Sequence, residues 1–140
     1  MKFNNSELTE CWNKVSSTFT TFQQNLNEMS EDIKTIEEML ATNSICKPYY
    51  WPYEFLRDNQ GHRYASYIAW TKVKGKYRLA TFNSYSSPGE ISDHEWDSMS
   101  ITPLIESKVD KRLEAYPHLK LFLESFSENL QKKPMEEIPF

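Results

Sequence analysis

The chain has 140 residues and a net charge of −4, with 39% hydrophobic and 14% aromatic residues. This length suits one domain with one core, and the apolar content excludes a disordered chain. No apolar run approaches the roughly 18 residues of a membrane span, and the start, MKFNNSELTE, lacks the apolar segment of a secretion signal. We therefore expect a cytoplasmic protein without a membrane segment. Two cysteines, Cys11 and Cys46, are too few for a disulfide framework, and no feature favours a bridge between them.

The opening segment predicts one long amphipathic helix from about Ser6 to Thr42. Neither proline nor glycine occurs in residues 1–47, and apolar residues recur in steps of four and three without a slip. At 1.5 Å per residue the helix would be about 55 Å long, which exceeds the width of a domain of this size. The alternative is a break near NLNEMSED, where Ser30 would cap a second helix.

The apolar stripe of this helix has the seven-residue period of a coiled coil. Its a positions are Trp12, Phe19, Leu26, Ile33 and Leu40, and its d positions are Leu8, Val15, Phe22, Met29 and Ile36. Tryptophan and phenylalanine at a suit a parallel two-stranded coiled coil poorly. We therefore interpret the aromatic part, Trp12 to Phe22, as core of the chain's own domain and the aliphatic part as a seam for a second copy. The predicted dimer seam is Leu26, Met29, Ile33, Ile36 and Leu40. The alternative is that the whole stripe packs on its own domain.

Residues 44–101 predict an antiparallel β-meander. Apolar and polar residues alternate from Tyr49 onward, and Pro52 places this first strand at an edge. RDNQGH is a turn, and RYASYIAWTKV and KYRLATFNSY are two strands joined by Lys74-Gly75. A two-residue turn sets three pairs opposite one another: Val73 with Lys76, Lys72 with Tyr77, and Trp70 with Leu79. The expected core face holds Ile68, Trp70, Tyr77 and Leu79. SSPG ends the meander, and EWDSMSIT adds a short fourth strand.

The C-terminal third is expected to be helical. Thr102 and Pro103 have the pattern of an N-cap and first helical residue, Ser107 and Asp110 have the spacing of a capping box, and Pro117 breaks or restarts the helix. The fold class is therefore α+β, with helices against one face of a three- to four-stranded sheet. We interpret residues 1–140 as a single domain: the helix in 1–43, the meander in 44–101, helices in 102–133 and a tail in 134–140. The tail, PMEEIPF, either docks in a groove or is frayed.

The charge distribution singles out the hairpin. Residues 59–89 carry five basic and no acidic residues, whereas 1–42 and 90–140 have local charges of −4 and −5. Cations bind phosphate and aromatic rings stack on bases, so the segment 63–82 is a candidate for an anionic protein partner or for nucleic acid. Lysines at a hairpin also simply keep strand edges from pairing. The partner-binding candidates are Arg63, Lys72, Lys74, Lys76, Arg78, Trp70 and Tyr77.

Signals for catalysis are few. Asp93, His94, Glu95 and Asp97 of DHEWD lack a metalloprotease spacing, and Cys46 beside Lys47 has no fixed base. We found no phosphate-binding loop, no dinucleotide fingerprint and no nucleophile elbow, and we expect no cofactor or metal. The hypothesis is a non-enzymatic interaction or adaptor protein, homodimeric through the long helix. The alternative is a nucleic-acid-binding accessory protein that uses the basic hairpin.

Overall fold

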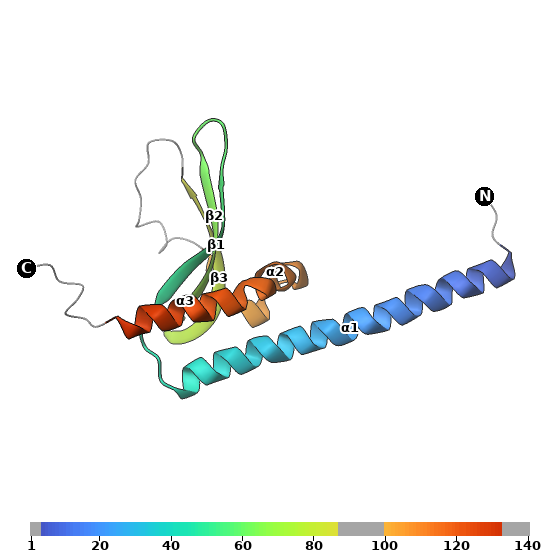
Figure 1. Ribbon diagram of the computed structural model, residues 1–140, viewed down its shortest axis with the longest axis horizontal. Helices are drawn as coiled ribbons and strands as arrows, with labels where there is room; N and C mark the ends of the chain where they lie inside the picture. The colour runs from blue at the N-terminus through green and yellow to red at the C-terminus, as the bar shows by residue number, and fades with distance from the viewer. Residues whose placement is uncertain (1–3, 87–99, 133–140) are drawn as a thin grey trace, which may run out of the picture.

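The computed structural model describes residues 4–86 and 100–132. Its elements, in chain order, are α1 (Asn5–Thr42), β1 (Tyr49–Arg57), β2 (Arg63–Val73), β3 (Lys76–Ser86), β4 (Thr102–Pro103), the 3₁₀ helix η2 (Leu104–Glu106), α2 (Val109–Ala115), the 3₁₀ helix η3 (Tyr116–His118) and α3 (Leu119–Gln131). The four strands form one antiparallel sheet in the order β1-β2-β3-β4. The α+β class is confirmed; α3 crosses the lower part of the sheet, and α1 passes below the sheet and α3 (Figure 1).

Helix α1 is continuous, so the alternative of a break at Ser30 is wrong. It begins with a capping box in which the Asn4 side chain accepts from the Glu7 N–H (2.7 Å) and the Glu7 carboxylate accepts from the Asn4 N–H (3.2 Å). This box satisfies two backbone donors that a helix start otherwise leaves unpaired. Ser30 lies mid-helix, where its Oγ accepts from Arg112 Nη1 at 2.8 Å.

The β2–β3 hairpin has the register expected from its turn. Val73 pairs with Lys76, Lys72 with Tyr77 and Trp70 with Leu79. Both turn residues have positive φ, 54° at Lys74 and 83° at Gly75, as a two-residue type I′ turn requires. Strand β1 lies at the sheet edge, as Pro52 predicted, and its pairing with β2 shifts between Pro52 and Glu54.

The core lies between the sheet and the helices. Ile68, Trp70 and Leu79 share one sheet face and are fully buried, as predicted, and Tyr77 packs against them half-buried. The helices contribute Ile33 from α1 and Phe122 and Phe126 from α3, and the Phe126 ring stacks on Tyr49 with centroids 5.0 Å apart. Burial of each such side chain contributes about 1.5–3 kcal/mol, so this cluster fixes where α1 docks.

Two expectations for the C-terminal third are wrong. Thr102 and Pro103 form strand β4, because Thr102 pairs with Thr81 on the open edge of β3. Ser107 does not cap α2; its hydroxyl donates to the Leu104 carbonyl (2.6 Å), and Lys108 precedes the helix. The break at Pro117 is confirmed, since it lies in η3 between α2 and α3. The start of EWDSMSIT, most of SSPG, the DHEWD motif and the tail 134–140 lie outside the described residues.

Candidate interaction site

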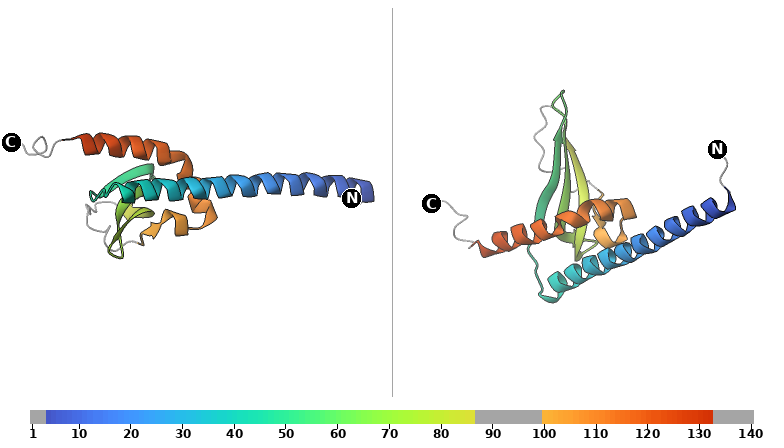
Figure 2. Two further views of the ribbon diagram at one scale, coloured as in Figure 1. Left: turned by 90° about the horizontal axis from the view of Figure 1, so that it is seen from below. Right: turned by 45° about the vertical axis from the view of Figure 1, so that its right-hand side comes forward.

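Helix α1 runs well beyond the rest of the fold. Its C-terminal half lies below the sheet and α3, and its N-terminal half extends away from them in all three views (Figures 1 and 2). We call residues 5–25 the overhang and residues 26–42 the docked half. The cause is in the chain connection, because the six residues 43–48 tether β1 to the C-terminal end of α1. A helix of 38 residues is about 57 Å long, whereas a small domain is about 30 Å across, so the free end projects.

The overhang carries a stripe of large apolar side chains that are exposed. Trp12 is 68% exposed and Phe19 57% exposed, although side chains of this size are usually enclosed. We call this set the overhang stripe; its members are Leu8, Trp12, Val15, Phe19 and Phe22. An ordered apolar row of this kind, continuous in phase along one helix, is typical of a surface that another protein covers.

The docked half presents the opposite picture. Ile33 is fully buried, Met29 and Leu40 are nearly so, and Leu26 and Ile36 pack against the same core half-buried. All five residues predicted as a dimer seam thus lie in the core of their own domain. The sequence interpretation reversed the two halves: the aliphatic part is core, and the aromatic part is exposed.

Polar contacts fix the docked half in place. Glu37, whose side chain is 18% exposed, accepts from the Leu79 backbone N–H at 2.9 Å and from Arg78 Nε at 3.1 Å. The Leu79 N–H lies on the edge of β3 beyond the two residues that β4 pairs. Tyr116 donates to Asp32 Oδ2 at 2.5 Å; this hydrogen bond and partial desolvation raise the pKa of Tyr116. These contacts hold α1 against the sheet edge and η3.

The flanks of the overhang stripe are uncharged. At the e and g positions from residue 9 to 25, beside the apolar a and d positions, lie only Thr9, Cys11, Ser16, Thr18, Gln23 and Asn25. The charged residues of the overhang, Glu7, Glu10 and Lys14, occupy outer positions of the heptad. In coiled coils, charged residues at the e and g positions select the partner. Because these positions are uncharged in the overhang, they do not repel an identical helix and do not select a different one.

The basic hairpin is not one surface. Trp70 is fully buried, and its Nε1 donates to the Ile45 carbonyl at 2.7 Å, while the Tyr77 hydroxyl donates to the Cys46 carbonyl at 2.5 Å. Both rings therefore hold the connection that follows α1. Arg78 bridges Glu37 and Glu106, and the hydrogen bond that its Nε donates to Glu37 outweighs partial desolvation and raises the pKa of the guanidinium.

The remaining hairpin candidates are split between the two ends of the strands. Lys72, Lys74 and Lys76 are exposed at the β2–β3 turn, with Lys72 Nζ 5.8 Å from the Tyr77 ring centroid. Arg63 pairs with Ser86 at the opposite end of the sheet. The exposed basic surface of the hairpin is therefore three lysines at one turn, without the stacking aromatics that the sequence placed among them.

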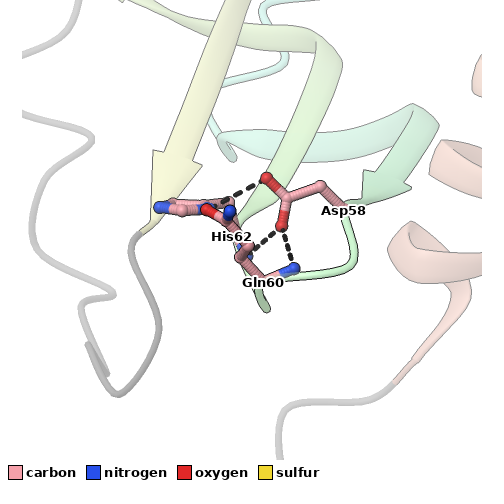
Figure 3. Close-up of polar contacts among 3 residues, drawn as sticks. All are labelled: Asp58, Gln60 and His62. Carbon is pink, nitrogen blue, oxygen red and sulfur yellow. Dashed lines mark hydrogen bonds and ion pairs between the residues drawn. The ribbon is translucent and has the colours of Figure 1, made fainter.

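The turn between β1 and β2 holds an aspartate–histidine pair (Figure 3). Asp58 Oδ1 accepts from the backbone N–H groups of Gln60 and His62, each at 2.9 Å, and Asp58 Oδ2 lies 2.8 Å from His62 Nδ1. Desolvation raises the pKa of Asp58, but the hydrogen bonds from His62 and Gln60 outweigh it and leave the pKa below its usual value. The carboxylate closes the turn, which is a structural role.

A polar cluster that sequence reasoning missed joins α2 to the sheet. The Tyr53 hydroxyl donates to Glu114 Oε1 at 3.0 Å, Lys111 Nζ lies 3.6 Å from the same carboxylate oxygen, and Lys111 also donates to Asn83 Oδ1 at 3.2 Å. Burial, followed by the hydrogen bond to Glu114, raises the pKa of Tyr53 far above its usual range. The polar groups of this cluster pair with one another, so its role is to hold α2 against the sheet. The alternation of β1 hid it, because Tyr53 lies at the register shift.

The candidates for reactive groups stay separate. Cys11 on the overhang and Cys46 after α1 are both exposed and free. Within residues 4–86 and 100–132, no group of three histidine, cysteine or acidic side chains is placed to hold a metal ion. In the same part of the chain, no helix has the length and apolar content needed to cross a membrane.

Comparison with protein-family models, with curated proteins and with solved structures found no match to this chain.

Proposed function

We propose that this is a non-enzymatic interaction protein that self-associates through the overhang. The observation that carries the proposal is the overhang stripe, five large apolar side chains in one row on a helix segment that leaves its own domain. Contiguous exposed apolar surface of this kind marks an interaction site or an aggregation hazard. Its regular heptad phase favours the ordered alternative, in which a helix packs along it.

The composition of the overhang also indicates that it needs a partner. Residues 15–22, VSSTFTTF, consist only of valine, serine, threonine and phenylalanine. These residues have lower helix propensity than alanine or leucine, and Thr20 and Thr21 donate to the carbonyls of Ser16 and Ser17. Most of the stability of a helix in a protein comes from packing of its apolar face rather than from propensity, and the overhang has no such packing within its own chain. Burial of the overhang stripe against another helix would supply the missing stability.

A second copy is the partner that the charges favour. The uncharged flanks allow two identical stripes to meet without like-charge repulsion, although each chain carries a net charge of −4. A different, charged partner would find no complementary residues beside the stripe. Most soluble oligomers also consist of identical chains, and in a two-fold dimer the same surface of each chain meets its copy.

The surface area that the overhang stripe can bury indicates how tightly two copies should bind. The three aromatic side chains of the overhang stripe are 45–68% exposed. A fully enclosed aromatic side chain buries about 150–250 Å², so covering the exposed parts of the stripe on both copies buries on the order of 600–1,000 Å². Standard stable interfaces begin at about 1,200 Å². We therefore expect a reversible dimer that dissociates in the micromolar range.

Sedimentation equilibrium of the full chain over a range of concentrations tests the proposal. The wild type should pass from monomer to dimer, and Trp12→Ala with Phe19→Ala should remain monomeric. In dilute solution, where the wild type is also monomeric, the two proteins should have the same unfolding midpoint by circular dichroism. Met39→Ala is the matched control, because Met39 is 59% exposed on the same helix but off the stripe. A wild type that stays monomeric at high micromolar concentration would refute the proposal.

The basic hairpin supports a nucleic-acid role less well. Three of its seven candidates, Trp70, Tyr77 and Arg78, are engaged in contacts within the chain. The lysines at the turn alone offer charge without stacking rings, which sequence-tolerant binding of single strands combines.

A further inference from the structure

We infer that the second copy lies antiparallel to the first, with the two-fold axis at Ser17, so that the two domains sit at opposite ends of a shared helical rod. The inference rests on the proposed function, because it specifies how the two overhangs meet. It follows from the spacing of the stripe, the side chains in each layer and the point at which the domain begins to cover α1.

The apolar positions are symmetric about Ser17. Going outward, the positions two residues away hold Val15 and Phe19, those five residues away hold Trp12 and Phe22, and those nine residues away hold Leu8 and Leu26. An antiparallel copy centred on Ser17 therefore sets Val15 against the partner's Phe19, Trp12 against the partner's Phe22 and Leu8 against the partner's Leu26. Each layer combines an a position with a d position of the other chain.

This register also matches the length of the overhang. Leu26 is half-buried where the domain begins to cover α1, and the partner's Leu8 would lie level with it. All five exposed residues of the overhang stripe then face an apolar side chain. Two other antiparallel registers differ from this one by a single heptad. The register centred between Asn13 and Lys14 would place Phe22 opposite the partner's Asn5 and leave the aromatic ring uncovered. The register centred between Thr20 and Thr21 would place Leu8 opposite the partner's Ile33, which its own domain already buries.

A parallel pair fits the same residues less well. It would place Trp12 against the partner's Trp12 and Phe19 against the partner's Phe19, both at a positions where parallel dimers favour β-branched residues. It would also bring two domains of net charge −4 to the same end of the rod. The antiparallel arrangement separates them and puts Val15, the smallest member of the stripe, against Phe19.

Distances between spin labels separate the possible arrangements. The background is Cys11→Ser with Cys46→Ser, which removes both native thiols, and one label is attached at Lys34→Cys on the exposed face of the docked half. Lys34 lies 17 residues from the axis on each chain, in opposite directions. At 1.5 Å per residue the antiparallel pair therefore predicts a separation of about 50 Å between the two labels. A second variant, Ser17→Cys, places the label at the axis and should give a separation below about 30 Å, two helices being about 10 Å apart.

Pulsed electron spin resonance at a concentration where sedimentation shows dimer gives the readout. A long separation at residue 34 together with a short one at residue 17 supports the inference. Short separations at both sites would mean a parallel pair, and about 60 Å or about 40 Å at residue 34 would mean one of the two shifted antiparallel registers. Each of these results would overturn the inference while leaving the dimer. A labelled protein that sediments as a monomer would instead overturn the proposed function.

Discussion

The two halves of α1 share one heptad pattern and have opposite surroundings. In the docked half, Ile33 is fully buried among Trp70, Leu79 and the α3 side chains; in the overhang, Trp12 and Phe19 are exposed. The difference teaches that an apolar period specifies a helix and one apolar face, but not what covers that face. Which part of the apolar face the domain covers depends on where the connection after α1 places the sheet and on how far the domain extends along the helix.

The largest expected effect is the difference in stability lost when an apolar side chain is removed from the docked half or from the overhang. Ile33→Ala removes a fully buried side chain and should lower the free energy of unfolding by about 2–5 kcal/mol. Phe19→Ala in the overhang should change it by less than about 0.5 kcal/mol in the monomer, because an exposed side chain loses little contact. Urea unfolding in dilute solution measures both. Equal losses would mean that the overhang is packed in the monomer.

The next effect concerns the contact that locks the docked half to the sheet. Glu37→Ala leaves the Leu79 N–H and the Arg78 guanidinium without their shared acceptor and should cost about 1–3 kcal/mol. Glu38→Ala is the matched control, since Glu38 is the exposed neighbour on the same helix. Thermal unfolding compares the two; if they behave alike, Glu37 does not fix α1.

A smaller effect depends on pH. The pKa of Tyr116 is raised in the folded chain, so its hydrogen bond to Asp32 contributes stability at pH values below the ordinary tyrosine pKa of about 10. This contribution is lost as pH rises through the raised value. Tyr116→Phe should therefore be less stable than wild type by about 0.5–1.5 kcal/mol near neutral pH. The two unfolding curves should converge in strong alkali. A constant difference across the alkaline range would contradict this assignment.

The smallest effect is expected at the hairpin turn. Lys74→Glu with Lys76→Glu should leave dimerisation and unfolding unchanged, because both side chains are exposed and belong to the β2–β3 turn, which lies away from the overhang (Figure 1). A labelled single-stranded oligonucleotide at about 50 mM salt provides the second readout. Salt-sensitive binding that the charge reversal abolishes would restore the nucleic-acid alternative and place the working surface on the sheet.

Much of the fold was predictable from local patterns. The uninterrupted stripe predicted one helix, and the Lys74-Gly75 turn predicted the register of β2 and β3 residue by residue, because a two-residue turn leaves no freedom in pairing. The spacing of Asn4 and Glu7 is a further capping-box signal in the sequence, and it sets the start of the helix at Asn5. The capping assignments at Thr102 and Ser107 failed because β3 offered Thr102 a free edge, which is tertiary information.

The candidate site was predictable only in part. The sequence predicted that α1 would outrun its domain, since its length follows from the rise per residue. It assigned the wrong half, because tryptophan and phenylalanine are core residues by composition and the aliphatic residues suit a helix seam equally well. The six residues 43–48 between α1 and β1 were the missed signal, because a short connection fixes the domain to the C-terminal end of the helix.

Amide hydrogen exchange at low and high micromolar concentration tests the central claim most directly, because it reads both halves of α1 in one experiment. The docked half should be protected at both concentrations. The overhang should exchange rapidly in dilute solution, where its helix lacks packing, and become protected as the dimer forms, and Trp12→Ala with Phe19→Ala should abolish that gain. Overhang protection that does not change with concentration would contradict the claim that a second copy covers this surface.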